Sequence, residues 1–190
     1  MAKKESTFVS MVTTLSIVAL VAAALLGGVY EVTKEPIRLA ELRKRNEAIE
    51  TVVPAFDTVP SDQIVKYGID GDTLTLYPAV KDGQVIGTAV ETFTNSGFSG
   101  EFKLMVGFDN EGAIVDIAVL KHSETPGLGD KMERAKSDFH LQFMGKHPDE
   151  FNLAVTKDNG DVDAITASTI SSRAYCEAVE RAYEAWKATR

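Results

Sequence analysis

The chain opens with a long apolar run. No side chain in residues 8–30 is charged, over 23 residues. A helix rises about 1.5 Å per residue, so a run of this length reaches across the hydrocarbon core of a bilayer. Lys3 and Lys4 precede the run, and an acid-leaning segment beginning at Glu31 follows it. The pattern predicts a single transmembrane helix within residues 1–30, with the N-terminus in the cytoplasm and the rest of the chain exported.

A cleaved signal peptide is the alternative interpretation of this run. It has a short basic start and three consecutive alanines at positions 22–24. However, the apolar stretch exceeds the roughly 7–15 residues of a signal hydrophobic region. No sharp small-residue cleavage site leads into a polar mature start. A retained anchor is therefore favoured.

An amphipathic segment follows the apolar run. Apolar residues recur at helical spacing through residues 36–52, with charged residues between them. This predicts a helix that ends before Pro54, and Pro36 suits either a continuation of the anchor or a fresh first turn. We expect residues 31–56 to link the anchor to a globular domain formed by residues 57–190.

The middle of the chain has the apolar patterning of strands. The predicted strands are residues 73–80, 85–93, 101–108 and 113–121. Turn signals separate them at Asp82-Gly83 and at residues 109–112, and a loop with two glycines occupies residues 95–100. Short connections of this kind predict an antiparallel meander with one buried face.

Helical and apolar segments complete the domain. Residues 131–144 carry apolar side chains at helical spacing, and the short apolar segment 152–155 is interpreted as a strand. From Ile170 onward, alanines and aromatic residues recur on one face and predict a long terminal helix, in which Cys176 is a small packed side chain. The predicted fold class is α+β, with a single N-terminal transmembrane helix followed by an antiparallel-sheet domain with packed helices.

Composition and charge exclude several classes of function. The net charge is −8 and no Lys/Arg-rich run exists, so a nucleic-acid partner is not expected. A single cysteine rules out an internal disulfide and a thiolate metal cluster. The three histidines, which are His122, His140 and His147, show no metal-ligand spacing. We interpret them as surface residues and expect no metal site.

One candidate segment, residues 122–130, directly follows a predicted strand. It combines two glycines, a proline and several hydrogen-bonding side chains. Such a loop brings backbone N–H groups close to a ligand, because glycine has no Cβ. Its local chemistry is equally that of a strand-to-helix connection with a turn at Pro126-Gly127.

A second candidate segment, residues 163–173, runs into the predicted terminal helix. Five hydroxyl side chains lie within residues 166–172. A helix N-terminus presents unpaired N–H groups and the positive end of the helix dipole, so it suits a phosphate. Arg173 can add a charge-assisted hydrogen bond. An ordinary N-cap with spare hydroxyls is the alternative.

Both segments resemble signatures of one protein family. The sequence Asp163-Ala164-Ile165-Thr166-Ala167-Ser168-Thr169 resembles the signature Asp-x-x-Ser/Thr-Gly-Ala-Thr of FMN-binding domains that an ApbE-type flavin transferase modifies. In that family the last threonine carries FMN through a phosphoester bond. The segment Ser123–Gly129 resembles the second signature, which lines the flavin. Ala167 and Ser168 stand where the family usually has Gly and Ala, which matters at position 167 if the backbone there needs a positive φ.

The resemblance implies covalently bound FMN and a set of site residues. Thr169 is implied as the residue that carries the FMN phosphoryl group. The implied surrounding residues are Glu124, Thr125, Gly127, Leu128, Asp163, Thr166, Ser168, Ile170, Ser171 and Arg173.

The size, the single anchor and the order of the motifs resemble the G subunit of Rnf-type complexes. This resemblance implies an electron-carrier subunit of an ion-translocating ferredoxin:NAD oxidoreductase, with no independent substrate reaction. Its implied partners are the other membrane subunits and the flavin transferase. The implied location is a bacterial inner membrane, with the main domain periplasmic or extracytoplasmic. The alternatives are the C subunit of sodium-translocating NADH:quinone oxidoreductase, which is typically longer, a free-standing exported flavoprotein, and an assembly subunit without flavin.

Overall fold

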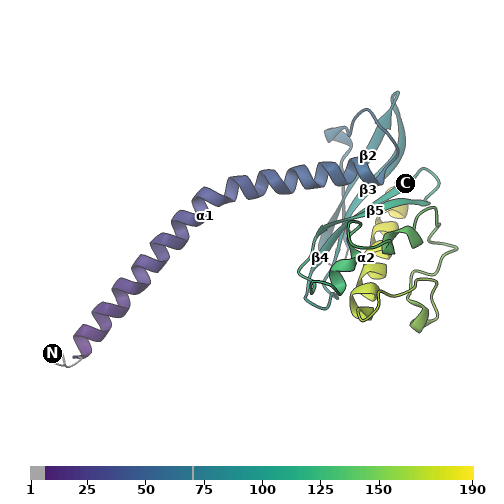
Figure 1. Cartoon of the computed structure of the whole chain (residues 1–190). Coiled ribbons are helices and arrows are strands. Elements are labelled where there is room, and N and C mark those ends of the chain that lie inside the picture. The colour runs from purple at the N-terminus through teal and green to yellow at the C-terminus, as the bar shows by residue number, and fades with distance from the viewer. Residues whose placement is uncertain (1–6, 70) are drawn as a thin grey trace. The chain divides into compact units, whose positions relative to one another are not determined.

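The computed structural model describes residues 7–69 and 71–190. Lys3 and Lys4, on which the predicted orientation depends, lie outside the described residues. The chain forms two compact units, Met1–Arg43 and Lys44–Arg190. The described part of the first unit is helical from Phe8 onward, and the second unit contains the sheet (Figure 1).

The helix α1 extends from Phe8 to Val52 without interruption. The segment from Pro36 therefore continues the N-terminal helix and does not start a new one. The helix contains a window of mean hydropathy 2.4, none of which is buried, so by length and composition it can cross a membrane. The hydroxyls of Thr13 and Thr14 donate to carbonyls four residues earlier. These polar groups are thereby satisfied within the helix, as a lipid environment requires.

A five-stranded antiparallel sheet forms the centre of the second unit. Its strands are β1 (Val65–Ile69), β2 (Asp72–Lys81), β3 (Gln84–Thr94), β4 (Phe102–Asp109) and β5 (Ile114–Lys121). They pair in sequence order, so the predicted meander is confirmed. The sequence did not predict β1. Val65, Tyr67 and Ile69 alternate with non-apolar residues, as in a strand, but this pattern extends over only five residues at a largely exposed edge of the sheet.

The helix α2 (Thr169–Ala188) covers one face of the sheet (Figure 1). Its alanines Ala174, Ala178 and Ala182 are almost fully buried, and their small size lets the helix approach the strands closely. The hydroxyl of Thr92 in β3 donates to the carbonyl of Ala178 at 3.0 Å, which fixes the helix on the sheet. Cys176 is buried, as predicted, and burial raises the pKa of its thiol to about 12.

The opposite face of the sheet is also buried, so the prediction of a single buried face was wrong. Ala48, Ile49 and Val52 at the end of α1 pack against apolar side chains of β2, β3 and β4. Gly107 in β4 makes this close approach possible, because a Cβ on it would lie 1.6 Å from the carbonyl oxygen of Val52. The end of α1 is thus an integral part of the second unit.

The predicted helix over residues 131–144 was also wrong. This segment contains two short 3₁₀ helices, Gly129–Met132 and Phe139–Gln142, separated by turns. Ser137 explains the interruption, because its hydroxyl donates to the carbonyl of Lys131 and accepts from the N–H of Phe139. Serine competes in this way with the backbone hydrogen bonds of a helix.

The predicted strand over residues 152–155 was wrong as well. Only Val155 makes an isolated bridge, with Val162, and a 3₁₀ turn (Thr156–Asp158) follows it. The segment from residue 152 to 162 folds into a compact loop in which Gly160 lies against Ala154. A Cβ on Gly160 would come within 2.0 Å of the carbonyl oxygen of Ala154. The chain therefore turns back on itself before a strand can extend.

The contact between Gly107 and Val52 gives a test of this packing. We expect Gly107→Ala to lower the free energy of unfolding of the full chain in detergent by about 3 kcal/mol, because the added methyl displaces the end of α1. Gly68→Ala is the matched control, since its Cβ would meet only an oxygen 3.9 Å away. Denaturant titration measures both, and equal stabilities of the two variants would contradict the packing described.

Candidate functional site

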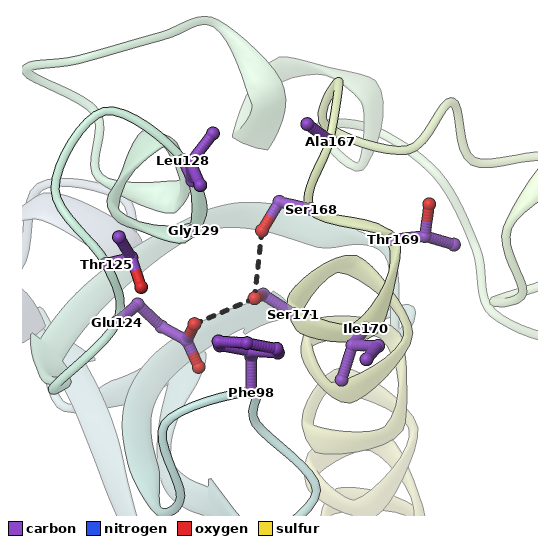
Figure 2. Close-up of a pocket in the computed structure, with 10 residues that line it drawn as sticks. All are labelled: Phe98, Glu124, Thr125, Leu128, Gly129, Ala167, Ser168, Thr169, Ile170 and Ser171. Carbon is purple, nitrogen blue, oxygen red and sulfur yellow. Dashed lines mark hydrogen bonds between the residues drawn. The ribbon is translucent and has the colours of Figure 1, made fainter.

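A cavity of about 320 Å³ opens where three segments meet. The segments are the loop between β3 and β4, the loop that follows β5, and the first turn of α2. The cavity is lined by Phe98, Glu124, Thr125, Leu128, Gly129, Ala167, Ser168, Thr169, Ile170 and Ser171 (Figure 2). Its volume lies at the lower end of the roughly 300–1,000 Å³ of small-molecule and cofactor sites.

A buried carboxylate joins the three segments. Glu124 is only 5% exposed. It accepts a hydrogen bond from the hydroxyl of Ser171 at 2.9 Å and another from the N–H of Ser99 at 3.2 Å. Ser168 extends this chain by donating to Ser171 at 2.9 Å (Figure 2). A buried charged or polar group needs such partners, so these bonds define the shape of the cavity.

Two glycines let the surrounding backbone approach this carboxylate. A Cβ on Gly129 would lie 2.5 Å from Oε2 of Glu124 and 2.8 Å from the hydroxyl of Ser171. A Cβ on Gly97 would lie 2.8 Å from Oε1 of Glu124 and 2.3 Å from the carbonyl oxygen of Gly100. Any side chain at either position would displace the Glu124–Ser171 hydrogen bond or the loop that contains it.

Charged groups hold the loop after β5 in place. Asp130 is buried and pairs with Lys136 at 2.9 Å. The hydrogen bond from Lys136 lowers the pKa of Asp130 below its ordinary value of 3.8, and a bond from the N–H of Gly127 lowers it further. At the start of the loop, Nδ1 of His122 accepts the N–H of Glu124 at 3.0 Å, and Nε2 lies 2.7 Å from Glu133. The neutral His122 ring therefore carries its proton on Nε2 and donates it to that carboxylate.

The backbone at the start of α2 is open to an anion. Ser168 occupies the N-cap position but makes no side-chain cap, because its hydroxyl is directed to Ser171. The first N–H groups of the helix thus have no capping side chain. Ala167, which precedes the cap, has φ of +60°. This left-handed conformation favours glycine, the residue that the covalent-flavin signature has at this position.

Thr169 contacts a lysine that the sequence analysis did not identify. Nζ of Lys157 donates to the hydroxyl of Thr169 at 3.2 Å. In Figure 2 the side chain of Thr169 points away from the Glu124–Ser171 pair. Arg173, the predicted cation, instead forms a two-point ion pair with Asp158 at 2.6 and 2.8 Å.

Apolar side chains surround the cavity. Phe98 is 66% exposed, Ile170 48% and Leu128 40%. Large apolar side chains that remain exposed together around a concave site are typical of a surface that a ligand covers. An aromatic or fused-ring ligand suits this rim, because Phe98 offers a ring face or edge for stacking.

The structure brings together most of the predicted site residues. The seven that line the cavity are Thr169, Ser168, Ile170, Ser171, Glu124, Thr125 and Leu128. The four that do not line it are Gly127, Asp163, Thr166 and Arg173. Asp163 is exposed, and its backbone pairs with the side-chain amide of Gln142.

Three lining residues, Phe98, Gly129 and Ala167, were not among the predicted site residues. A signal for Phe98 is present in the sequence, because a lone aromatic residue stands in a glycine-containing loop between two strands. The histidines were wrongly expected at the surface. His140 is buried, and His122 and His147 are half-buried.

Comparisons with known proteins agree with this geometry. A family model described as an FMN-binding domain matches residues 97–184, which include every residue lining the cavity. The chain is similar to the G subunit of the ion-translocating oxidoreductase complex of Vibrio cholerae, at 34% identity over 179 residues, covering 90% of this chain and 86% of the relative. The corresponding protein of Haemophilus influenzae is also 34% identical, with 88% and 84% covered. That of Shewanella oneidensis is 41% identical over 114 residues, which span 58% of this chain and about half (54%) of that relative.

The positive φ of Ala167 predicts a stabilising substitution. We expect Ala167→Gly to raise the free energy of unfolding by about 1 kcal/mol, because glycine adopts this conformation without the steric cost of a Cβ. Ala164→Gly is the control, since Ala164 has no positive φ and should lose stability on substitution. Denaturant titration of both variants measures the difference. A loss of stability in Ala167→Gly would contradict the strain inferred at this position.

Proposed function

The chain belongs to the family of G subunits of ion-translocating oxidoreductase complexes, and from this premise we propose that it is the FMN-carrying electron-transfer subunit of an Rnf-type ferredoxin:NAD oxidoreductase. FMN accepts and releases electrons singly or in pairs, so a domain that holds it can relay electrons between partner proteins. The partners in this proposal are the other membrane subunits of the complex, and the chain has no separate substrate.

We propose further that FMN is attached covalently through its phosphate to Thr169. The observation that carries this proposal is the cavity itself, which Thr169, at the uncapped start of α2, lines together with residues of the loop after β5. The helix N-terminus favours the phosphate, and Phe98, Leu128 and Ile170 offer an apolar surface to the ring. The residues present therefore fit the cofactor. An ApbE-type flavin transferase is the proposed source of the modification.

The proposed location is a bacterial inner membrane, crossed once by α1, with the second unit on the periplasmic or extracytoplasmic side. The apolar window of α1 supports the crossing, and Lys3 and Lys4 before it support the orientation. Covalent attachment suits this side of the membrane, because FMN released there would be diluted away from the protein.

Intact mass tests the covalent site. We expect the full chain, purified from cells with an active flavin transferase, to carry the mass increment of one FMN moiety, and Thr169→Ala to lack it. Thr73→Ala is the matched control, because Thr73 is exposed on β2, lies outside both signatures and does not line the cavity. It should retain the increment. A mass increment that persists in Thr169→Ala would exclude Thr169 as the attachment site. A wild-type chain without the mass increment would contradict covalent FMN.

Protease accessibility tests the orientation. In spheroplasts with an intact inner membrane, added protease should remove a C-terminal epitope, because the second unit lies outside the cytoplasm. An N-terminal epitope on the same chain is the internal control and should remain protected until the cells are lysed. Protection of the C-terminal epitope in intact spheroplasts would overturn the proposed topology.

A further inference from the structure

We propose that Lys157 positions the flavin phosphate at Thr169, both while the phosphoester forms and afterwards. This inference rests on the proposed function, since it concerns the same hydroxyl. It replaces Arg173, the cation that the sequence indicated, with one that sequence patterning did not identify.

Lys157 contacts the hydroxyl group that the proposal assigns to the flavin phosphate. Nζ of Lys157 lies 3.2 Å from the hydroxyl oxygen of Thr169. A phosphoryl group bonded to that oxygen places its own oxygens within reach of the same ammonium group. A charge-assisted hydrogen bond of this kind is roughly twice as strong as a neutral one.

Lys157 and Arg173 differ in how far a neighbouring carboxylate compensates their charge. Arg173 binds Asp158 through two nitrogen atoms, so its charge is already compensated. Among the ion pairs of residues 7–69 and 71–190, none involves Lys157. Arg173 is the main cause of the lowered pKa of Asp158, and the charge of Lys157 contributes less to it. The ammonium group of Lys157 forms no ion pair with a carboxylate of the described residues and is therefore available to a phosphate.

Backbone hydrogen bonds and two buried valines hold the loop that carries Lys157. The N–H of Thr156 donates to Val162 at 2.8 Å, and the N–H of Gly160 donates to Val155 at 3.1 Å. Val155 and Val162 are fully buried, and Gly160 packs so closely against the backbone of Ala154 that no side chain would fit there. The exposed Lys157 is thus carried by a loop anchored in the core, which reduces the entropy lost when it binds a phosphate.

The chemical step that this arrangement serves is a phosphoryl transfer. Joining a hydroxyl to a phosphate requires a leaving group better than water, which the pyrophosphate of a flavin dinucleotide provides. The Thr169 hydroxyl oxygen forms the new bond to the flavin-side phosphorus, the pyrophosphate P–O bond breaks, and a nucleoside monophosphate leaves. The hydroxyl proton passes to a base of the transferase. Lys157 stabilises the negative charge on the phosphoryl oxygens during this transfer.

The test is the rate at which the purified full chain gains the flavin mass increment from a flavin dinucleotide and purified transferase. We expect Lys157→Gln to react about tenfold more slowly than the unmodified sequence at low salt, and Lys157→Arg to restore most of the rate. Added salt should reduce the difference in reaction rate between the wild-type chain and Lys157→Gln, because salt screens the exposed charge of Lys157. Lys66→Gln is the matched control, because Lys66 is exposed on β1 and does not line the cavity, and it should keep at least half the rate.

Different outcomes separate this inference from the proposed function. Equal rates for the unmodified sequence and Lys157→Gln would overturn the role of Lys157 while leaving covalent FMN intact. A second result would also overturn the role of Lys157: Lys157→Gln reacts slowly, Lys157→Arg does not restore the rate, and the loss of rate does not depend on salt. A purely structural role of Lys157 would have these properties. If the wild-type chain gains no mass, the proposed covalent site is overturned, and this inference with it.

Discussion

A charged group can be buried only if hydrogen-bond donors satisfy it, and the candidate site is organised around one such group. The Glu124 carboxylate draws its donors from Ser171 on α2 and from Ser99 in the loop between β3 and β4. Three segments that are distant in sequence must therefore meet at one point. Gly97 and Gly129 are required for the same reason, because they leave the space in which this carboxylate accepts its bonds. The cavity is the space that remains beside this network.

The sequence predicted the central part of the fold well. Alternating and apolar runs predicted β2 to β5, and the 3.6-residue recurrence of alanines and aromatics predicted α2, because each of these elements buries a regular stripe of apolar side chains. The prediction from sequence failed where side-chain contacts take the place of the regular backbone hydrogen bonds of a helix. Residues 131–144 have helical spacing, yet Ser137 and the neighbouring ion pairs break the helix into turns. The burial of the second face of the sheet was not predictable either, because it depends on the end of α1 packing over Gly107.

The site was predictable to the extent that it is contiguous in sequence. Residues 168–171 and residues 124–128 were recognised because each group forms a local motif, and both contribute to the cavity. Phe98 and Lys157 were missed because each reaches the site from another part of the chain and neither belongs to a motif of the family signatures. Phe98 stands out only as a lone aromatic residue in a glycine-containing loop. Arg173 illustrates the converse. It lies one turn into the helix, as a phosphate ligand would, but a nearby carboxylate engages it first.

The burial of Cys176 has a consequence for the way in which this protein can tolerate oxidants. With the pKa of its thiol raised to about 12 and only 2% of the residue exposed, almost no thiolate forms at neutral pH, and no oxidant reaches the sulfur directly. Mixed disulfides and sulfenic acid both require that thiolate. The chain can therefore persist among oxidised small thiols and peroxides without acquiring covalent adducts at its single cysteine, on whichever side of a membrane it resides.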